Sequence, residues 1–429
     1  MNTTSPNSNS TMGPMIIIGA LFFIFGFVTW LNGPLIIYAK LAFNLDTYAK
    51  AFMVTTAFYM AYFFLALPSS WILEKTGMKR GMALGLLVMA IGTFIFGTFA
   101  TQRNYPVSLF GLFVIGSGLS LLQTASNPYV TILGPIESAA RRISIMGICN
   151  KLAGILSPII ISALIFSGSK GLDLESQVAQ AATQVEKDAI LDGFASQIYM
   201  PYMVMAVILV VLAGWIVRSG LPDIDPSTAN EQPVGDANIS REKTSILQFP
   251  HLLLGALCIF LYVGVEVMAG DAIGVYAQGF DIPASKTTIY TSFTLGAMLV
   301  GYIIGLITIP KIMTQEQALK ISAILGIIFT VGAYFTSGYV SVAFVALLGL
   351  ANALMWPAIW PLAISGLGRF TEKGSALLVM GIAGGAIIPQ LFGSLKDHFN
   401  FQVVFLILMG VCYLYIYYYS RSGFKAGKN

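Results

Sequence analysis

Three charged side chains stand inside long apolar stretches of this 429-residue chain. Lys151 lies within GICNKLAGILSP, and apolar sequence continues from there to Phe166. Glu266 and Asp271 share the stretch LYVGVEVMAGDAIGVYAQ. Charged groups are costly at bilayer depth, so each of the three is expected to serve function. Because opposite charges lower each other's cost, we expect Lys151 to pair with Glu266 or, as the second choice, with Asp271.

The two acids need not face the same way on a regular helix. Five residues separate them, which is a turn of about 140° around the axis. A helix break at Gly270 would bring them together. Lys151 also has an alternative without a specific role, in which its long side chain reaches a water-filled cavity on the cytoplasmic side.

The composition requires a lipid environment around these residues. The chain is 56% hydrophobic and 10% charged, whereas soluble domains carry about 25% charged residues. A spanning helix needs about 20 apolar residues. Twelve segments meet that requirement and predict an all-α membrane protein: 15–39, 51–73, 80–101, 107–134, 144–167, 199–218, 251–278, 287–309, 319–336, 340–367, 374–394 and 400–420.

The segments divide into two bundles of six. Residues 219–248 are rich in Pro, Asp, Asn and Ser, a linker composition. They separate a first bundle at 14–218 from a second at 249–429, and residues 1–13 form an uncharged tail that we expect to be disordered. The motif Met146–Pro158 is echoed by Met380–Gly393, so segment eleven repeats segment five.

Basic residues in the loops predict the orientation. If the N-terminus is cytoplasmic, 15 Lys and Arg residues fall on the cytoplasmic side and 7 on the other. We therefore expect both termini, and the linker, in the cytoplasm.

One loop between the second and third segments, SSWILEKTGMKRG, resembles the signature of the major facilitator superfamily. The resemblance implies two six-helix bundles that rock around a midplane site. It also implies a gating loop in which Glu74 contacts basic groups in one conformation, although a generic charged loop would read similarly. The candidate gating residues are Glu74, Lys75, Gly77, Lys79, Arg80, Arg141 and Arg142.

A narrower resemblance covers essentially all twelve segments. The stretches FFIFGFVTWLNGPLI, LLQTASNPYVTILGPIESAARRISIMGICN and LMWPAIWPLAISGLG are similar to the fucose–galactose–glucose symporter family. This implies uptake of a hexose or related monosaccharide with co-transported Na⁺ or H⁺. The fucose branch carries carboxylates where this chain has Gly33 and Gln123, and Gln123 fits the glucose/galactose branch. Their absence slightly favours Na⁺, while Glu266 or Asp271 could still take up a proton.

The same resemblance implies that amides and aromatic rings hold the sugar. Hydroxyls suit amide partners and a sugar ring suits an aromatic floor, although such residues also serve interhelical hydrogen bonding and packing. The candidates are Asn32, Gln123, Asn127, Asn150, Asn352, Trp30, Trp356, Trp360 and Tyr276.

Other functions remain as alternatives. An amino sugar such as N-acetylglucosamine, or fucose, could replace the hexose, and a membrane sugar sensor without flux is possible. An enzyme is not expected, because the sequence has no Ser–His–Asp arrangement and its three cysteines and two histidines show no metal-ligand spacing. We expect no cofactor, no bound metal except Na⁺, no nucleic acid, and a monomer in a bacterial-type inner membrane.

Overall fold

The computed structural model describes residues 9–133, 139–165, 174–221, 244–309 and 311–427. Helices and short loops make up this described part, and it holds no strand. Helices are required because backbone groups in lipid need partners within their own segment.

The first half starts with a helix that is longer than expected. It begins at Asn9, inside the range that we assigned to the tail, while residues 1–8 lie outside the described part. The elements of this half are α1 (Asn9–Thr29), α2 (Asn32–Ala42), α3 (Tyr48–Ala51), α4 (Met53–Thr76), α5 (Met78–Thr101), α6 (Tyr105–Ile132), α7 (Ala139–Ile165), α8 (Leu174–Gln180), α9 (Gln184–Ala195), η2 (Ser196–Ile198) and α10 (Tyr199–Arg218).

The second half contains more interrupted helices. Its elements are η4 (Ile246–Gln248), α12 (Pro250–Gly270), α13 (Ile273–Gln278), α14 (Ala284–Thr287), α15 (Tyr290–Thr308), α16 (Gln315–Phe335), α17 (Gly338–Asn352), α18 (Met355–Ile364), η5 (Gly368–Phe370), α19 (Thr371–Met380), η6 (Gly381–Ala383), α20 (Gly384–Lys396), α21 (Phe401–Arg421) and η7 (Gly423–Lys425).

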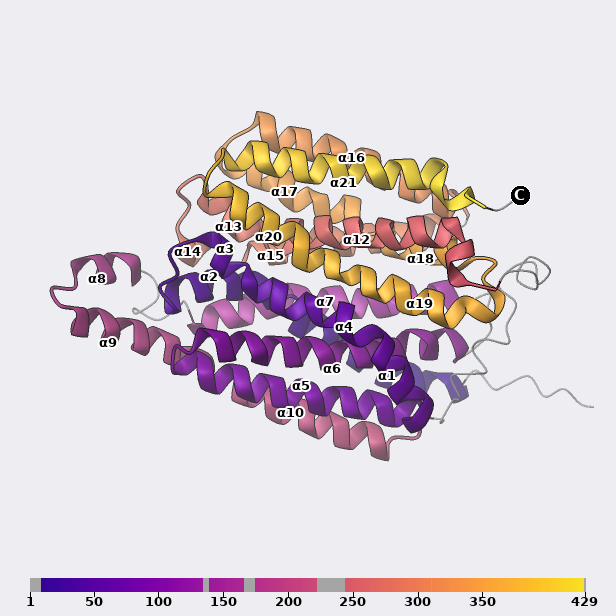
Figure 1. Ribbon diagram of the computed structural model, residues 1–429, viewed down its shortest axis with the longest axis horizontal. Coiled ribbons are helices and arrows are strands. Elements are labelled where there is room, and N and C mark those ends of the chain that lie inside the picture. The colour runs from indigo at the N-terminus through magenta and orange to yellow at the C-terminus, as the bar shows by residue number, and fades with distance from the viewer. Residues whose placement is uncertain (1–8, 134–138, 166–173, 222–243, 310, 428–429) are drawn as a thin grey trace, which may run out of the picture.

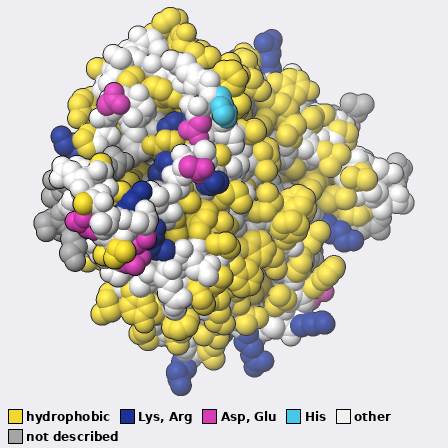
Figure 2. Space-filling model, turned by 60° about the vertical axis from the view of Figure 1, so that its left-hand side comes forward, with side chains coloured by type: hydrophobic (Ala, Val, Ile, Leu, Met, Phe, Trp, Pro, Cys, Tyr) yellow, Lys and Arg dark blue, Asp and Glu magenta, His cyan; other side chains and the backbone are white. Residues whose placement is uncertain are grey.

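Twelve helical segments in the described residues are long and apolar enough to cross a membrane. Six precede residues 222–243, which belong to the expected linker and lie outside the description, and six follow them. Figure 1 shows the two sets as neighbouring layers, with the C-terminus at one end and α8 and α9 projecting from the other. The flank seen in Figure 2 is mostly hydrophobic, and charged side chains gather where the α8–α9 end comes forward.

Several segments break near their middle. The first breaks between α1 and α2 at Trp30–Leu31, and the seventh breaks between α12 and α13 at Asp271–Ala272. The second break directly follows Gly270, where the sequence analysis considered a helix break. Backbone irregularity of this kind is tolerated at membrane depth only where protein or water surrounds it.

Close helix contacts depend on glycine in both halves. A Cβ added at Gly26 of α1 would lie 1.9 Å from the Asn150 carbonyl oxygen of α7. A Cβ added at Gly384 of α20 would lie 1.7 Å from the Phe260 carbonyl oxygen of α12. Each half thus has a seam where only glycine fits.

The α8–α9 hairpin is tied to the end of α2. Arg103 donates from Nε to the Ala42 carbonyl, and its Nη1 lies 3.1 Å from Asp188 and 3.2 Å from Asp192 of α9. The Tyr38 hydroxyl of α2 donates to the carbonyl oxygen of Ala195, the last residue of α9, at 2.8 Å. The hairpin and α2 therefore share a rigid connection.

Candidate functional site

An ion pair joins the two halves at the centre of the molecule. Lys151 Nζ of α7 lies 3.0 Å from Glu266 Oε1 of α12. The two side chains are 7% and 12% exposed. This is the first of the two pairings that the sequence offered, and it brings together residues 115 positions apart.

The indole of Trp30 lies against this ion pair. Lys151 Nζ is 4.5 Å from the centroid of the Trp30 ring, within reach of a cation–π contact. Gly154 makes room for the indole, because a Cβ there would lie 2.5 Å from Trp30 Cδ1. Trp30 Nε1 is buried and has no acceptor in the described part of the chain. The ring therefore offers an unused hydrogen-bond donor beside the ion pair.

Aromatic side chains extend the centre into the second half. The Tyr262 hydroxyl approaches the carboxylate of Glu266, and the Tyr262 and Trp356 ring centroids are 6.4 Å apart. Trp356 stacks on Trp360 with centroids 5.2 Å apart and an interplanar angle of 28°. Both indoles are partly exposed. We call Lys151, Glu266, Trp30, Tyr262 and Trp356 the central cluster.

Two expected amides from the first half remain partly exposed. Gln123 Nε2 donates to the Tyr62 hydroxyl at 3.1 Å. Asn150 Nδ2 donates to the Phe22 carbonyl at 3.4 Å, and Asn150 directly precedes Lys151. Asn127 is also partly exposed and lies one helical turn beyond Gln123 on α6. A primary amide has two donors and two acceptor lone pairs, so these groups retain capacity for a ligand.

Three other candidates are engaged within their own half. Asn32 is 1% exposed and donates to the Thr29 carbonyl at 3.0 Å. Asn352 is fully buried, accepts from the Tyr413 hydroxyl at 2.8 Å and donates to the Val265 carbonyl.

Tyr276 is buried as well, and its hydroxyl lies 2.7 Å from Ser341 Oγ. Its ring packs on Phe401 and Phe405. The structure therefore does not bring Tyr276 to the central cluster, whereas Asn352 holds the backbone directly before Glu266.

Asp271 occupies the break between α12 and α13 and does not pair with Lys151. It is 1% exposed. Its Oδ2 accepts from the Tyr59 hydroxyl of α4 at 3.3 Å, and its Oδ1 has no hydrogen-bond partner among the described residues. This carboxyl is therefore buried between the halves, with the Tyr59 hydroxyl as its side-chain donor and the Gly33 backbone N–H close by.

A second set of contacts joins the halves at the end that carries α8 and α9. Tyr48 of α3 donates from its backbone N–H to Asp397 Oδ2 at 3.0 Å and from its hydroxyl to Gln278 Oε1 at 2.9 Å. Lys396 Nζ lies 3.5 Å from the Tyr48 ring centroid. We call Tyr48, Gln278, Lys396 and Asp397 the Tyr48 latch.

Sequence reasoning missed the tyrosines of α3 and α4. The Tyr59 hydroxyl donates to Asp271, and the Tyr62 hydroxyl accepts from Gln123. The Tyr48 hydroxyl donates to Gln278 in the Tyr48 latch. A buried tyrosine usually needs a partner for its hydroxyl, so the pair Tyr59 and Tyr62 in an apolar segment was a usable signal.

The candidate gating loop forms a tight turn at Gly77, where φ is 75° and glycine is favoured. Lys79 Nζ donates to the Ser219 carbonyl at 2.6 Å. Glu74, Lys75 and Arg80 are exposed, and Glu74 makes no ion pair with a described residue.

The two basic residues after α6, Arg141 and Arg142, differ in their surroundings. Arg142 is buried and donates from Nε to the Val130 carbonyl at 2.8 Å, and the side chain of Arg141 lies outside the description.

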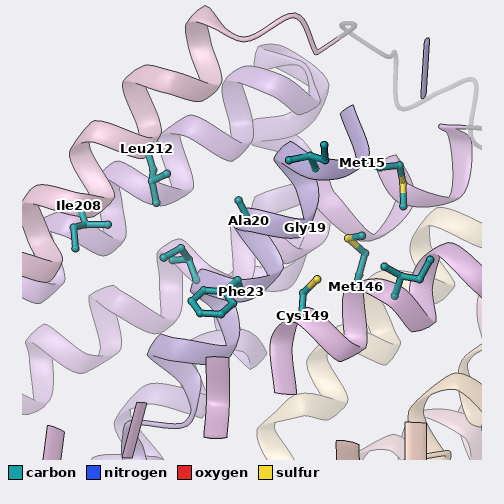
Figure 3. A pocket seen from close by; sticks show the side chains of 11 residues that line it. Met15, Gly19, Ala20, Phe23, Met146, Cys149, Ile208 and Leu212 are labelled. Carbon is teal, nitrogen blue, oxygen red and sulfur yellow. The ribbon is translucent and has the colours of Figure 1, made fainter. Parts of the chain in front are cut away.

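A large hollow lies away from the central cluster. It has a volume of about 690 Å³ and lies between α1, α7 and α10. Figure 3 shows Phe23, Met146, Cys149 and Leu212 pointing into it. Its lining is hydrophobic apart from the Cys149 thiol. It therefore lacks the amides and charges that recognition of a polar solute requires.

Comparison with known proteins decides the family. The Major Facilitator Superfamily pattern matches residues 18–389. The chain belongs to the Major Facilitator Superfamily. Membership agrees with the twelve spans and makes the protein a multi-pass membrane transporter rather than an enzyme.

Similar members of the superfamily support the narrower resemblance. The chain is 34% identical over 409 residues to a glucose/galactose transporter of Brucella abortus biovar 1 (strain 9-941), covering 95% of this chain and 93% of that protein. It is 26% identical to the L-fucose-proton symporter of Escherichia coli (strain K12) over 98% and 95% of the two chains. The crystal structure of the superfamily transporter FucP in the outward conformation matches with a TM-score of 0.73, 25% identity, and 96% and 99% coverage. The family and fold predictions are therefore confirmed.

Proposed function

We propose that the protein imports a monosaccharide, a hexose of the glucose/galactose type, by symport with a cation. The two halves rock around the central cluster and expose it to each side of the membrane in turn. The bilayer is a bacterial-type inner membrane, with both termini and the linker in the cytoplasm.

The observation that carries this proposal is the Lys151–Glu266 ion pair. It joins one residue from each half at 3.0 Å and is largely buried. A buried pair of this kind is destabilising to break unless another charge replaces the lost partner. A cation that binds or leaves close to the pair changes the charge available to it, so movement of the halves becomes linked to the co-transported cation.

The groups around the pair suit a sugar. Gln123 and Asn150 offer amides from the first half, and Trp356 and Trp360 offer stacked indole faces from the second. Trp30 adds an indole N–H that has no acceptor among the described residues. Amides read hydroxyl groups and indoles cover the apolar face of a ring. The full-length similarity to a named glucose/galactose transporter supports the same substrate class.

Fucose is the second candidate, because the L-fucose-proton symporter of Escherichia coli is similar along nearly the whole chain. Gln123 argues for glucose or galactose instead, because it stands where the fucose branch carries a carboxylate and donates to Tyr62.

Counterflow in proteoliposomes tests this proposal. Labelled D-glucose, D-galactose, L-fucose and N-acetylglucosamine are each offered with and without Na⁺ at two pH values. We expect saturable exchange of glucose or galactose, and accumulation when an inward cation gradient is imposed. Binding of sugar without exchange would instead identify a sensor, and exchange that no gradient drives would reject symport.

Two lysine variants provide the matched comparison. K151A should abolish accumulation because it removes one partner of the buried ion pair. K50A removes a lysine that pairs with Asp46 at the surface, where the side chains are 58% and 67% exposed, and should leave uptake unchanged.

A further inference from the structure

Asp271 is placed where the broken helices of the two halves meet. It directly follows α12, and its neighbour across the interface is Gly33 at the start of α2. A Cβ added at Gly33 would lie 3.3 Å from Asp271 Cα and 3.4 Å from Asp271 Oδ1. Thr291 Oγ1 lies closer still to that Cβ, at 2.3 Å, so Thr291 and Asp271 of the second half together border the space that a side chain at position 33 would enter.

The positive charge near this carboxyl, Lys151, is paired with another residue in the observed arrangement. Lys151 is held by Glu266 at 3.0 Å and by the Trp30 ring. Asp271 takes part in no ion pair with a described residue. A carboxylate that is 1% exposed, has neutral donors and forms no ion pair with a described residue is unfavourable in its ionised form.

The oxygen atoms nearby are already engaged with one another. Thr291 Oγ1 donates to the Gly270 carbonyl and Thr294 Oγ1 donates to the Ala269 carbonyl, both at 2.7 Å. The described residues contain no group of three or more His, Cys, Asp or Glu side chains that could hold a metal ion. The nearby hydroxyls therefore donate their hydrogens to backbone carbonyls, and Asp271 Oδ1 is left without a described hydrogen-bond donor and can bind a proton.

We propose that Asp271 is the site of the coupled cation and that this cation is a proton, bound while the halves are closed around it. This rests on the proposed symport function. When α2 and α4 move away, water reaches Asp271. The O–H bond then breaks, its electron pair stays on the carboxylate, and the proton passes to water. Rebinding reverses these steps on the other side of the membrane.

Three ionisable groups near Asp271 link its protonation to the central cluster. They are Tyr59 of α4, Lys151 of α7 and Glu266 of α12. The remaining neighbours, Gly33 of α2 and Thr291 of α15, do not titrate. An ionised Asp271 competes with Glu266 for Lys151, whereas a protonated Asp271 leaves the Lys151–Glu266 pair intact. Proton release is therefore linked to loosening of the contact between the halves.

Infrared pH-difference spectroscopy of the full chain in lipid tests the proton site without any sugar. The wild type should show the carbonyl band of a buried carboxylic acid at neutral pH, and D271N should lack it. Y59F should shift the frequency of this band without removing it, because Tyr59 donates to Oδ2. D46N is the control. The hydrogen bond from Lys50 holds the pKa of the exposed Asp46 below its ordinary value, so Asp46 is ionised and its loss should leave the band unchanged.

Two results would overturn the proposal: a band that persists unshifted in both D271N and Y59F, or a band that Na⁺ removes at constant pH. A transport arm separates this inference from the function itself. With D-galactose, D271N should keep exchange in counterflow. Under a pH gradient it should no longer accumulate the sugar, so the galactose concentrations on the two sides of the membrane become equal. If the wild type exchanges none of the four sugars, the proposed function fails, and the infrared result still decides whether Asp271 holds a proton.

Discussion

Two of the contacts between the halves differ in their chemistry. In the central cluster, a lysine and a glutamate that are 7% and 12% exposed face each other at 3.0 Å. In the Tyr48 latch, a neutral tyrosine donates two hydrogen bonds and a lysine covers its ring. The deep contact pairs two opposite charges, whereas the rim contact joins a neutral tyrosine to a carboxylate, an amide and an ammonium group.

This difference separates two tasks. A net intramolecular hydrogen bond contributes about 0.5–1.5 kcal/mol, so thermal motion can open the latch. Removing one partner of a buried ion pair costs about 3–5 kcal/mol, so the centre opens only when another charge takes over. We therefore expect the latch to determine how often this end opens, and the central ion pair to make opening depend on a change of charge.

The largest expected effect comes from breaking the central ion pair. K151A and E266Q should each lower the stability of the folded protein by about 3–5 kcal/mol, because each leaves an unpaired buried charge. Thermal unfolding in detergent and uptake into proteoliposomes measure the two consequences. The double variant should recover part of the stability. Single losses that simply add in the double variant would contradict a direct pairing.

Removal of an indole face should have the next largest effect. W356A takes away a ring that stacks on Trp360 and lies beside Tyr262. We expect the dissociation constant for galactose to rise about tenfold, which is about 1.4 kcal/mol. W71A is the matched control, because Trp71 is 64% exposed on α4. Equal affinity for W356A and wild type would remove Trp356 from the sugar site.

A smaller effect is expected at the latch. Y48F removes the hydrogen bond to Gln278 and should shift the open–closed equilibrium by about 1 kcal/mol toward opening. Dyes on D46C and F399C, in a chain without its three native cysteines, report the separation of the halves at this end. Y105F should leave the separation unchanged, because Tyr105 donates to the Lys50 carbonyl within the same half. A latch role is ruled out if Y48F and Y105F behave alike.

The smallest effect is expected for an exposed ion pair. D46N breaks the contact between Asp46 and Lys50, which are 67% and 58% exposed. Water and salt screen such a pair, and we expect no measurable change in unfolding temperature. A change as large as that of E266Q would show that burial does not explain the difference between the two ion pairs.

The fold was predictable because lipid imposes strong constraints. Long apolar segments have to be helices at bilayer depth, and an isolated lysine in such a segment has to find a partner. The twelve spans and the choice of Glu266 for Lys151 follow from those two arguments. Close packing at Gly154 and Gly384 has the same local origin, because an indole and a backbone carbonyl lie against glycines that have no side chain.

Other features depend on partners far away in the sequence. The breaks at Leu31 and Ala272 and the hydrogen bond from Tyr59 to Asp271 arise where segments one, two and seven meet. No periodicity within one segment reports such a meeting. Asn352 and Tyr276 show the converse, because amide and hydroxyl groups that suited a ligand are satisfied by Tyr413 and Ser341.

The connection between the α8–α9 hairpin and α2 gives access to the interior from outside the membrane. Arg103 and Tyr38 fasten α9 to α2, and α2 begins beside Gly33, against Asp271. An antibody fragment that clamps α8 and α9 should therefore restrain the proton site and slow counterflow, although its epitope never touches the sugar. The same fragment should still bind R103A but no longer inhibit it. Transport could then be controlled from this exposed hairpin, at a distance from the sugar site.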